Sequence, residues 1–394
     1  MAITDKEEGV WNLDEVYNKI NQGSIWEYDA QKELWMWGYE QTGNNTILAI
    51  SSPVQLPGTN WDTPYSFSYS EGATKSDGTL WLWGTNNKGQ LGDNSTVNRS
   101  SPIQVPGTWG TGESKFSYGA AYNAHAIKSD NTLWAWGYNQ YGTLGLGQPF
   151  PTTISSPVQM PGDWNKILPG GANGIFAIKT SGELWSWGYN GQGELGHNST
   201  IAYPNGQSSP KQVGTDTTWD TGCSNSATTH VIKTDGTMWS WGNNAYGKLG
   251  LNQTVNTRYS SPTQVPGTTW SSVSGQESGR CAVKTDGTFW TWGINDGDAR
   301  GRLGLNDAIH RSSPTQVGTD TTWTDCMAFG NGGHNATAGL KSDGTLWVWG
   351  SMYRNNPLNV PQNIHYSSPV QVPGTNWSNL SAMAFNTVGC IQGS

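Results

Sequence analysis

Residues 75–84 read KSDGTLWLWG, and five close copies of this phrase follow along the chain. The copies begin at Lys128, Lys179, Lys233, Lys284 and Lys341. In each copy two short apolar runs flank a two-residue turn that is often Asp-Gly. This is a strong hairpin signal, because both central residues of a type I′ turn need a positive φ. The phrase therefore predicts a β-hairpin that recurs through the chain.

Two further landmarks recur with this hairpin. The motif W-x-W-G occurs seven times, beginning at Trp35, Trp81, Trp134, Trp185, Trp239, Trp290 and Trp347. S-S-P-x-Q also occurs seven times, and a single Trp follows it at Trp61, Trp109, Trp164, Trp219, Trp270, Trp323 and Trp377. The spacing of about 50 residues is typical of propeller blades. Each unit reads as a four-stranded antiparallel meander, with two strands from the hairpin and one from each landmark.

The two ends of the chain complement each other. The last residues, TVGCIQGS, align with the strand before the hairpin turn and place Gln392 at the lysine position. The first W-x-W-G lacks that preceding strand. Joining the ends completes a blade and removes exposed sheet edges. The sequence therefore predicts an all-β fold over residues 31–394: a closed seven-bladed β-propeller of four-stranded antiparallel blades, one of them completed by both termini.

Residues 1–30 stand outside the repeat and are expected to form a separate N-terminal arm. Apolar residues spaced i, i+3, i+4 and i+7 predict a short amphipathic helix that ends near Gly23. The arm residues expected to serve in assembly are Trp11, Leu13, Val16, Tyr17, Ile20 and Trp26. The arm could cap its own propeller or attach the protein to a larger assembly.

Composition excludes several classes of function. Only 13% of the 394 residues are charged and the net charge is −8, which disfavours a nucleic-acid partner. No apolar run reaches the length of a membrane span, and no signal peptide is recognisable. The four cysteines show no C-x-x-C spacing and read as small buried hydrophobic residues. We expect no metal, no cofactor and no membrane insertion.

Tryptophan usage separates packing from function. Of the 23 tryptophans, 14 lie in the W-x-W-G motifs and seven at the single repeat position. Only Trp11 and Trp26 lie elsewhere, in the arm. Such regular recurrence favours packing between blades over a sugar-binding platform or a light-sensing cluster.

Segment lengths indicate which face of the propeller varies. The hairpin turn and the turn after S-S-P-x-Q are short and uniform, whereas the connections after W-x-W-G and after the single Trp vary in length. Alternate turns of a meander emerge on opposite faces, so both variable connections share one face, where binding usually resides. Exposed-looking aromatic residues and arginines there are the candidate binding residues: Phe150, Tyr203, Arg300, Arg302, Tyr353, Arg354 and Tyr366.

Catalysis finds little support in the sequence. Recurring aspartates such as Asp77 and Asp235 occupy the first turn position, which is a structural role. The six histidines show no metal-ligand spacing, and His125 and His230 occupy one strand position in two units. The repeated lysines precede an aspartate by two residues in most copies, which suggests local neutralisation. The chain is therefore expected not to be an enzyme.

The unit LWAWGYNQYGTLGLG…SSPVQMPG, preceded by AIKSDNT, resembles the regulator-of-chromosome-condensation repeat. The N-x-x-G-x-L-G part of that pattern matches at 86–92, 139–145 and 190–196, with longer variants at 243–250 and 295–304, and fails in the first and last units. The first and last units are adjacent in the closed ring, so one sector of the ring lacks the motif. Either the arm docks on this sector, or the sequence has drifted where the ring closes. The resemblance implies a seven-bladed propeller. Members of that family include an exchange factor, a photoreceptor, inhibitors and scaffolds, so the resemblance does not fix a function.

The arm carries a second resemblance. GVWNLDEVYNKINQGSIW is similar to short segments of bacteriophage structural proteins. This resemblance favours a non-enzymatic phage virion protein (tail, baseplate, fibre or capsid-decorating) that binds other virion proteins or a host-surface receptor through its variable loops. The alternative is a cytoplasmic protein-interaction scaffold or inhibitor built on the same propeller.

Overall fold

The computed structural model describes most of residues 33–392. The segments outside this description are 1–32, 39–49, 68–69, 120–121, 170–173, 202–204, 226, 254–256, 277–278, 296–300, 332–333, 353–363, 376, 382–387 and 393–394. The arm, with its six predicted assembly residues, thus lies outside the described part.

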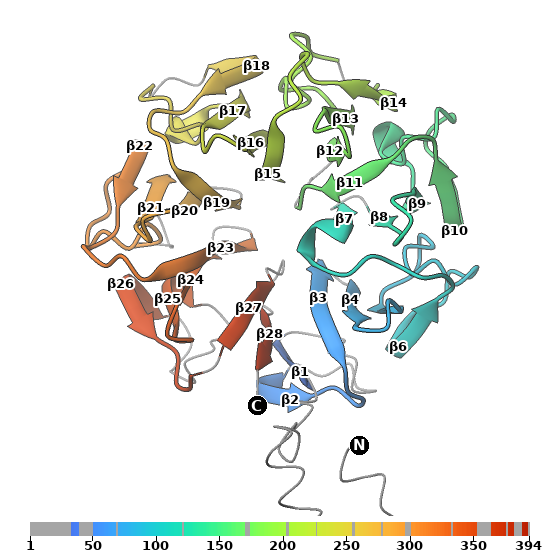
Figure 1. Ribbon diagram of the computed structural model, residues 1–394, viewed down its shortest axis with the longest axis horizontal. Helices are drawn as coiled ribbons and strands as arrows, with labels where there is room; N and C mark the ends of the chain where they lie inside the picture. The colour runs from blue at the N-terminus through green and yellow to red at the C-terminus, as the bar shows by residue number, and fades with distance from the viewer. Residues whose placement is uncertain are drawn as a thin grey trace, which may run out of the picture.

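Within the described residues the strands form seven four-stranded antiparallel sheets, arranged as blades around a ring (Figure 1). Seven is also the number of repeat units in the sequence. Blade 1 contains β3 (Trp61–Phe67), β4 (Ser70–Lys75), β5 (Leu80–Gly84) and β6 (Arg99–Val105); blade 2 contains β7 (Phe116–Gly119), β8 (Asn123–Ile127), β9 (Leu133–Tyr138) and β10 (Thr153–Met160); blade 3 contains β11 (Trp164–Ile167), β12 (Gly174–Lys179), β13 (Leu184–Gly188) and β14 (Gln207–Gln212).

The remaining blades repeat this order. Blade 4 contains β15 (Trp219–Asn225), β16 (Thr228–Lys233), β17 (Met238–Asn243) and β18 (Arg258–Gln264); blade 5 contains β19 (Trp270–Gly275), β20 (Gly279–Lys284), β21 (Phe289–Gly293) and β22 (Arg311–Gln316); blade 6 contains β23 (Trp323–Asn331), β24 (His334–Lys341), β25 (Leu346–Met352) and β26 (Ile364–Gln371); blade 7 contains β27 (Trp377–Ser381), β28 (Val388–Gln392), β1 (Glu33–Gly38) and β2 (Ile50–Gln55).

Blade 7 joins the two ends of the chain. β28 from the C-terminal end pairs with β1 from the N-terminal end, with Glu33 opposite Gln392 and Trp35 opposite Cys390. The pairing predicted between the two ends is therefore present, and Figure 1 shows β27 and β28 beside β1 and β2. β3 of blade 1 contacts β27 and β28, while β23 of blade 6 contacts β27 on the other side. Blade 7 thus bridges blades 6 and 1.

The apolar core is divided among the interfaces between blades. One cluster combines Leu82 and Leu91 of blade 1 with Phe116, Tyr118 and Trp136 of blade 2. Within the described blades, the second Trp of W-x-W-G is fully buried in such a cluster, as Trp136 is, whereas the first Trp is only partly buried. Both tryptophans therefore take part in packing between blades, the second within the cluster and the first partly exposed against it, as Trp134 is.

The predicted hairpin turns are present and are held by side chains. In the first copy Asp77 accepts hydrogen bonds from the Thr79 amide and hydroxyl, at 2.9 and 2.7 Å. Trp81 Nε1 in turn donates to the Thr79 hydroxyl at 2.8 Å. The same three-residue relay recurs at Asp130, Asp235, Asp286 and Asp343. The recurring aspartates therefore have the structural role expected of them.

The helical part of the predicted fold class needs correction. The described residues contain no α-helix; their helical segments are the short 3-10 turns Glu113–Lys115, Gln140–Gly142 and Ala245–Gly247. The described fold is thus all-β, because its backbone groups are paired in blade ladders. The helix expected around Leu13–Ile20 falls outside the described residues. In the part of the chain that is described, no helix has the length and hydropathy to cross a membrane.

Candidate functional site: the variable-loop face

The two faces of the ring carry different kinds of connection between strands. The hairpin turns at Ser76–Thr79 and the turns between blades at Pro106–Thr108 emerge together; we call this side the short-turn face. The connections between W-x-W-G and S-S-P, such as 85–98 in blade 1, emerge on the opposite side, which we call the loop face.

On the short-turn face each repeated lysine lies between two tryptophans. Lys233 Nζ lies 4.8 Å from the ring centre of Trp219 and 4.3 Å from that of Trp239. The two rings meet edge to face, 6.4 Å apart. The same arrangement occurs at Lys75, Lys128, Lys179, Lys284 and Lys341. A cation over an indole face is attracted by the ring quadrupole, so each lysine joins three strands of its blade.

This arrangement corrects the expected neutralisation of the lysines. Where an aspartate stands two residues after the lysine, it binds the turn threonine, as Asp235 binds Thr237. Lys233 forms its ion pair with Asp216, which comes from the preceding turn between blades. Lys341 pairs with Asp320 in the same way. The sequence signal for these pairs is the G-T-D-T-T-W segment, which blades 4 and 6 share.

On the loop face the N-x-x-G-x-L-G segment joins each of blades 1 to 4 to the next blade. The second Trp of the following blade donates its Nε1–H to a backbone carbonyl within the segment, as Trp187 does to Thr143 at 2.9 Å. The final glycine, Gly145, has φ 69°, and a Cβ there would lie 2.7 Å from Trp187 Nε1. Equivalent bonds join Trp136 to Gln90, Trp241 to Glu194 and Trp292 to Lys248. We call this contact the latch.

The latch also contains backbone contacts around the S-S-P motif. The Asn94 amide donates to the Ser155 carbonyl of the next blade at 2.9 Å, and the Asn198 amide donates to Ser260 at 2.7 Å. A Cβ at Gly89 would lie 2.7 Å from Ser155 Cα, so only glycine allows this approach. The shared part of each loop therefore holds the ring, and the positions available for binding are the residues beyond it and the exposed variable positions within it, such as Tyr246.

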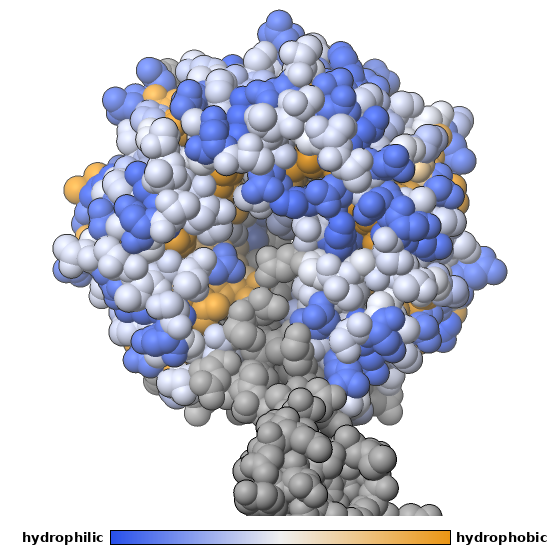
Figure 2. All heavy atoms as spheres, viewed as in Figure 1, coloured by the Kyte–Doolittle hydropathy of each residue, from blue (hydrophilic) through white to orange (hydrophobic). Residues whose placement is uncertain are grey.

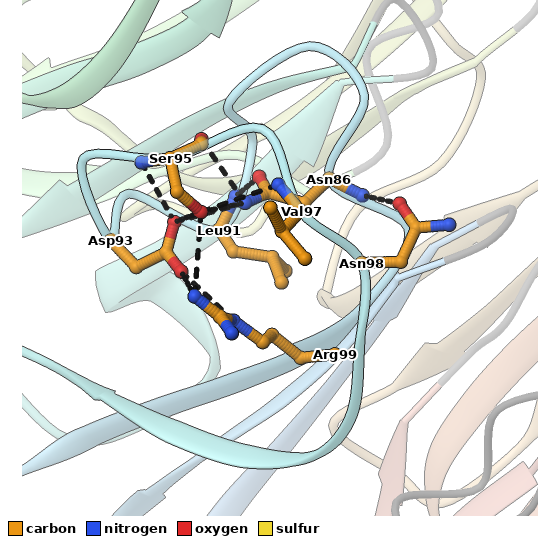
Figure 3. A network of polar contacts seen from close by, with 7 residues as sticks. All are labelled: Asn86, Leu91, Asp93, Ser95, Val97, Asn98 and Arg99. Atoms are coloured by element: carbon orange, nitrogen blue, oxygen red, sulfur yellow. Dashed lines mark hydrogen bonds and ion pairs between the residues drawn. The ribbon is translucent and has the colours of Figure 1, made fainter.

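Figure 3 shows how the loop of blade 1 is fixed beyond the latch. The carboxylate of Asp93 accepts from Asn86 Nδ2, Ser95 and both Nε and NH2 of Arg99, at 2.7 to 3.0 Å. Asn86 is buried, and its Oδ1 accepts from the Leu91 amide. These hydrogen bonds hold the pKa of Asp93 below its usual value although burial opposes them. The network orders the loop and leaves Val97 exposed on its surface.

The latch is incomplete at the entrance to blade 1. The preceding loop, from blade 7, lacks the N-x-x-G-x-L-G motif. Trp83 of blade 1 is fully buried, but its Nε1 has no hydrogen-bond partner among the described residues, and the same is true of Trp349 in blade 6. An orphaned buried donor costs free energy, so the interface between blades 7 and 1 is held less firmly than the latched ones.

Three of the seven predicted binding residues lie in the described part of the chain. Phe150 is half-buried in the loop of blade 2. Arg302 is 5% exposed, and its carbonyl accepts a hydrogen bond from the Thr337 hydroxyl of blade 6, so it belongs to the latch region. Tyr366 in β26 packs against the cores of blades 5 and 6. Tyr203, Arg300, Tyr353 and Arg354 lie outside the described residues.

Other exposed residues were missed from the sequence. Among the described residues, the exposed large hydrophobic side chains are Val97, Tyr246 and Ile309. All three belong to connections on the loop face. Val97 and Ile309 follow the N-x-x-G-x-L-G motif and Tyr246 stands at one of its variable positions, so the motif marks the loops but not which of their side chains are exposed. Figure 2 shows that hydrophilic residues predominate on the face it displays, with hydrophobic residues in small separate areas.

The described titratable groups do not assemble into a catalytic or metal site. Burial lowers the pKa of His125 to about 3 and raises that of the Cys223 thiol to about 12. His125 packs on Trp187 of the next blade, and His230 on Trp292. No group of three metal-ligating side chains occurs in the described residues. The absence of activity nevertheless stays a prediction.

Four segments match the regulator of chromosome condensation (RCC1) repeat: 77–123, 130–168, 181–224 and 235–276. Each begins in a hairpin turn and ends beyond the single Trp of the following blade. The matches support an RCC1-type β-propeller.

Solved structures agree on the fold. Prp20p from Saccharomyces cerevisiae, studied for its binding to Gsp1p and histones, is similar with a TM-score of 0.78 and 17% identity, over 98% of this chain and 96% of that one. Human WBSCR16 is similar with a TM-score of 0.73 and 16% identity, over 92% and 100%. At these identities the likeness shows the fold alone.

Sequence relatives carry different activities. The ultraviolet-B receptor UVR8 of Arabidopsis thaliana is 26% identical over 71% of this chain, and the human E3 ubiquitin-protein ligase HERC2 is 24% identical over 80%. The mitochondrial RCC1 domain-containing protein RUG3 of Arabidopsis thaliana is 27% identical over 72%. The chain spans 64% of UVR8, 64% of RUG3 and 6% of HERC2, less than two thirds of each.

These relatives overturn the expectation of a phage virion protein. The matching proteins named above come from a plant, from animals and from yeast. Yeast Prp20 has been examined with Gsp1p, with histones and with Kap60, none of which is a virion protein. The resemblance of the arm to phage segments covered about 18 residues and finds no support in these matches, whereas the propeller resemblance covers most of the chain. The expected virion location and virion partners are therefore withdrawn.

Proposed function

We propose that this chain is a non-enzymatic protein-interaction module that binds a partner protein through its loop face. The observation that carries the proposal is the division of each loop into two parts. The latch part repeats from blade to blade and is occupied by contacts within the ring. The part beyond it varies and holds the exposed Val97 and Ile309, and the third exposed large hydrophobic residue of the described chain, Tyr246, stands at a variable position within the repeated motif.

The relatives support an interaction role of this kind. Yeast Prp20 has been examined with Gsp1p, with histones and with Kap60. We further propose an intracellular location. Cys223, Cys281 and Cys326 are buried free thiols, which is typical of proteins in reducing compartments. The predicted binding residues Phe150, Tyr203, Arg300, Arg302, Tyr353, Arg354 and Tyr366 remain part of the proposal where they lie in the variable connections.

The experiment compares three groups of substitutions in the full chain. The first alters the loop face of blades 1–3 (Val97→Asp, Gln148→Lys, Thr200→Lys), and the second that of blades 4–5 (Tyr246→Ala, Ile309→Asp). The control alters the short-turn face (Thr108→Asp, Thr217→Asp). Every residue altered in the three groups is exposed. The tagged proteins are cross-linked in extracts of cells that express the chain, and the bound proteins are quantified by mass spectrometry.

We expect a saturable partner that one or both loop-face groups lose and the control retains. Retention of every saturable partner by both loop-face groups, or equal loss in the control, would show that the loop face is not the binding surface. Circular dichroism of each variant checks that the propeller remains folded.

A further inference from the structure

Two of the three exposed hydrophobic residues lie next to each other across the boundary between blades 4 and 5. Tyr246 is 53% exposed and follows β17; Ile309 is 63% exposed and precedes β22. The Tyr246 ring meets the His310 ring edge to face, with 5.5 Å between centroids. Tyr246, Ile309 and His310 therefore form one exposed surface, which we call the blade 4–5 patch.

The backbone beneath the patch is fixed. The Ile309 amide donates to Asp307 Oδ1 at 2.9 Å, and Arg311 donates to the Ile309 carbonyl at 2.8 Å. Arg311 also forms an ion pair with Asp307. The Asn295 amide donates to His310 Nδ1 at 3.0 Å, which sets the orientation of that ring. A surface held in this way loses little conformational entropy when a partner binds.

Tyr246 also has a backbone conformation that is unfavourable for tyrosine. Its φ is 58° and its ψ 25°, in the left-handed region where glycine and asparagine are preferred. Tyr141, at the equivalent position of blade 2, has φ 60°, but its ring packs 5.2 Å from Tyr189 and is half-buried. In blade 4 the strained residue instead presents its ring to solvent. Strain that displays an aromatic ring without burying it is characteristic of binding surfaces.

The charges beside the patch differ from the acidic character of the whole chain. The net charge is −8, yet Arg258 is exposed, and its Cα pairs with that of Asn243, three residues before Tyr246. The nearby carboxylate of Asp307 is already engaged by Arg311. The carboxylate that feels the charge of Arg258, Glu194 of blade 3, is buried, so this exposed cation complements an acidic group on a partner.

We propose that the blade 4–5 patch docks a segment of a partner protein that presents an apolar side chain beside a carboxylate. Tyr246 and Ile309 supply the apolar contact, and Arg258 attracts the carboxylate. This inference rests on the proposed function, because it assigns one part of the loop face and one class of partner.

The test uses a yeast-displayed library of random dodecapeptides, selected against the full-length protein. Enriched peptides are synthesised and their affinities measured by fluorescence polarisation. Four variants are compared with the natural protein: Tyr246→Asn and Ile309→Asp in the patch, Arg258→Gln beside it, and Val97→Asp as the matched control. Val97 is as exposed as the patch residues but lies in blade 1.

We expect enriched peptides that combine Leu, Ile or an aromatic residue with Asp or Glu. Tyr246→Asn and Ile309→Asp should each weaken binding about tenfold, Arg258→Gln should weaken it about threefold and reduce its dependence on salt, and Val97→Asp should leave it unchanged. Asparagine tolerates the left-handed conformation, so Tyr246→Asn should raise the melting temperature while it weakens binding. These opposite changes separate loss of a contact from loss of the fold.

Two results would overturn the inference. One is the absence of any enriched peptide. The other is a set of peptides whose affinity is unaffected by the patch variants; if Val97→Asp weakens them instead, the loop face still binds and only the assignment of the patch is wrong. The proposed function fails separately, when both loop-face groups keep every cross-linked partner.

Discussion

The two faces of this propeller are built from the same seven units but use them differently. On the short-turn face, six blades repeat one arrangement of a lysine between two tryptophans, and in five of them a hairpin aspartate binds the turn threonine. On the loop face, the same units repeat a latch to the next blade and then diverge. The difference shows that repetition marks what holds the ring, whereas divergence marks what the ring can bind.

The largest expected effect concerns the latch glycines. Gly145→Ala places a Cβ 2.7 Å from Trp187 Nε1 at a φ of 69°, and should lower the free energy of unfolding by about 3 kcal/mol or more. Gly214→Ala is the matched control, because Gly214 has φ 63° and nothing within 4 Å; it should cost about 1 kcal/mol. Urea denaturation measures both. Equal costs would show that the close approach to Trp187 does not hold the blades together.

Glu194 gives the latch a pH dependence opposite in direction to that of the short-turn aspartates. Burial raises the pKa of Glu194 to about 7. Because this lies above the unfolded value, the stabilising contribution is complete below about pH 4.5 and is lost as the pH rises through 7. The free energy of unfolding should therefore fall by up to about 3 kcal/mol across this window. Glu194→Gln should remove the decline; a variant with the unchanged decline would assign it to another group.

Latched and unlatched tryptophans should respond differently to the same substitution. Trp187→Phe removes the hydrogen bond to the Thr143 carbonyl as well as volume, and should cost about 2 kcal/mol. Trp83→Phe removes the same volume and an Nε1 that has no partner, so it should cost about 1 kcal/mol or less. Thermal unfolding of both variants measures the difference. Equal losses would mean that the hydrogen bond adds nothing to the latch.

The smallest expected effect concerns the short-turn face. Lys233→Met removes the cation between Trp219 and Trp239 and should cost about 1 kcal/mol. Lys88→Met, which removes a cation over the single ring of Tyr138 on the loop face, should cost less. Hydrogen bonds with Lys233 and Thr218 lower the pKa of Asp216 to about 2. The stability from this pair should thus persist above about pH 3.8 and fade as the pH falls towards 2, and that acid loss should be smaller in Lys233→Met.

Local sequence signals were sufficient to predict the strands and the pairing between the two ends of the chain. The Asp-Gly turns, the alternation around W-x-W-G and the match of Gln392 to the lysine position depend on residues close together in the chain or on a register that one alignment fixes. The virion function inferred from the arm was wrong, because a short resemblance outside the propeller carried it. The arm itself lies outside the described residues.

The sequence could not identify the candidate site in the same way. Arg302 and Tyr366 looked like exposed loop residues, but Arg302 is 5% exposed and Tyr366 packs on two cores. Tyr246 was not selected, although it is among the most exposed large side chains described. Whether a loop side chain is exposed depends on its contacts with the neighbouring blade. The sequence around a single position does not identify those contacts.

The sequence by itself determined the repeat, its strands and the way the termini complete a blade, since all of these follow from turn chemistry and a period of about 50 residues. Only the tertiary structure decided which tryptophans are buried, which glycines are required and which aromatic ring reaches solvent. The physical reason is that each blade buries its second Trp against atoms contributed about 45 residues earlier in the chain, as Trp187 does against Thr143. Contacts of that range have no signature in any single repeat.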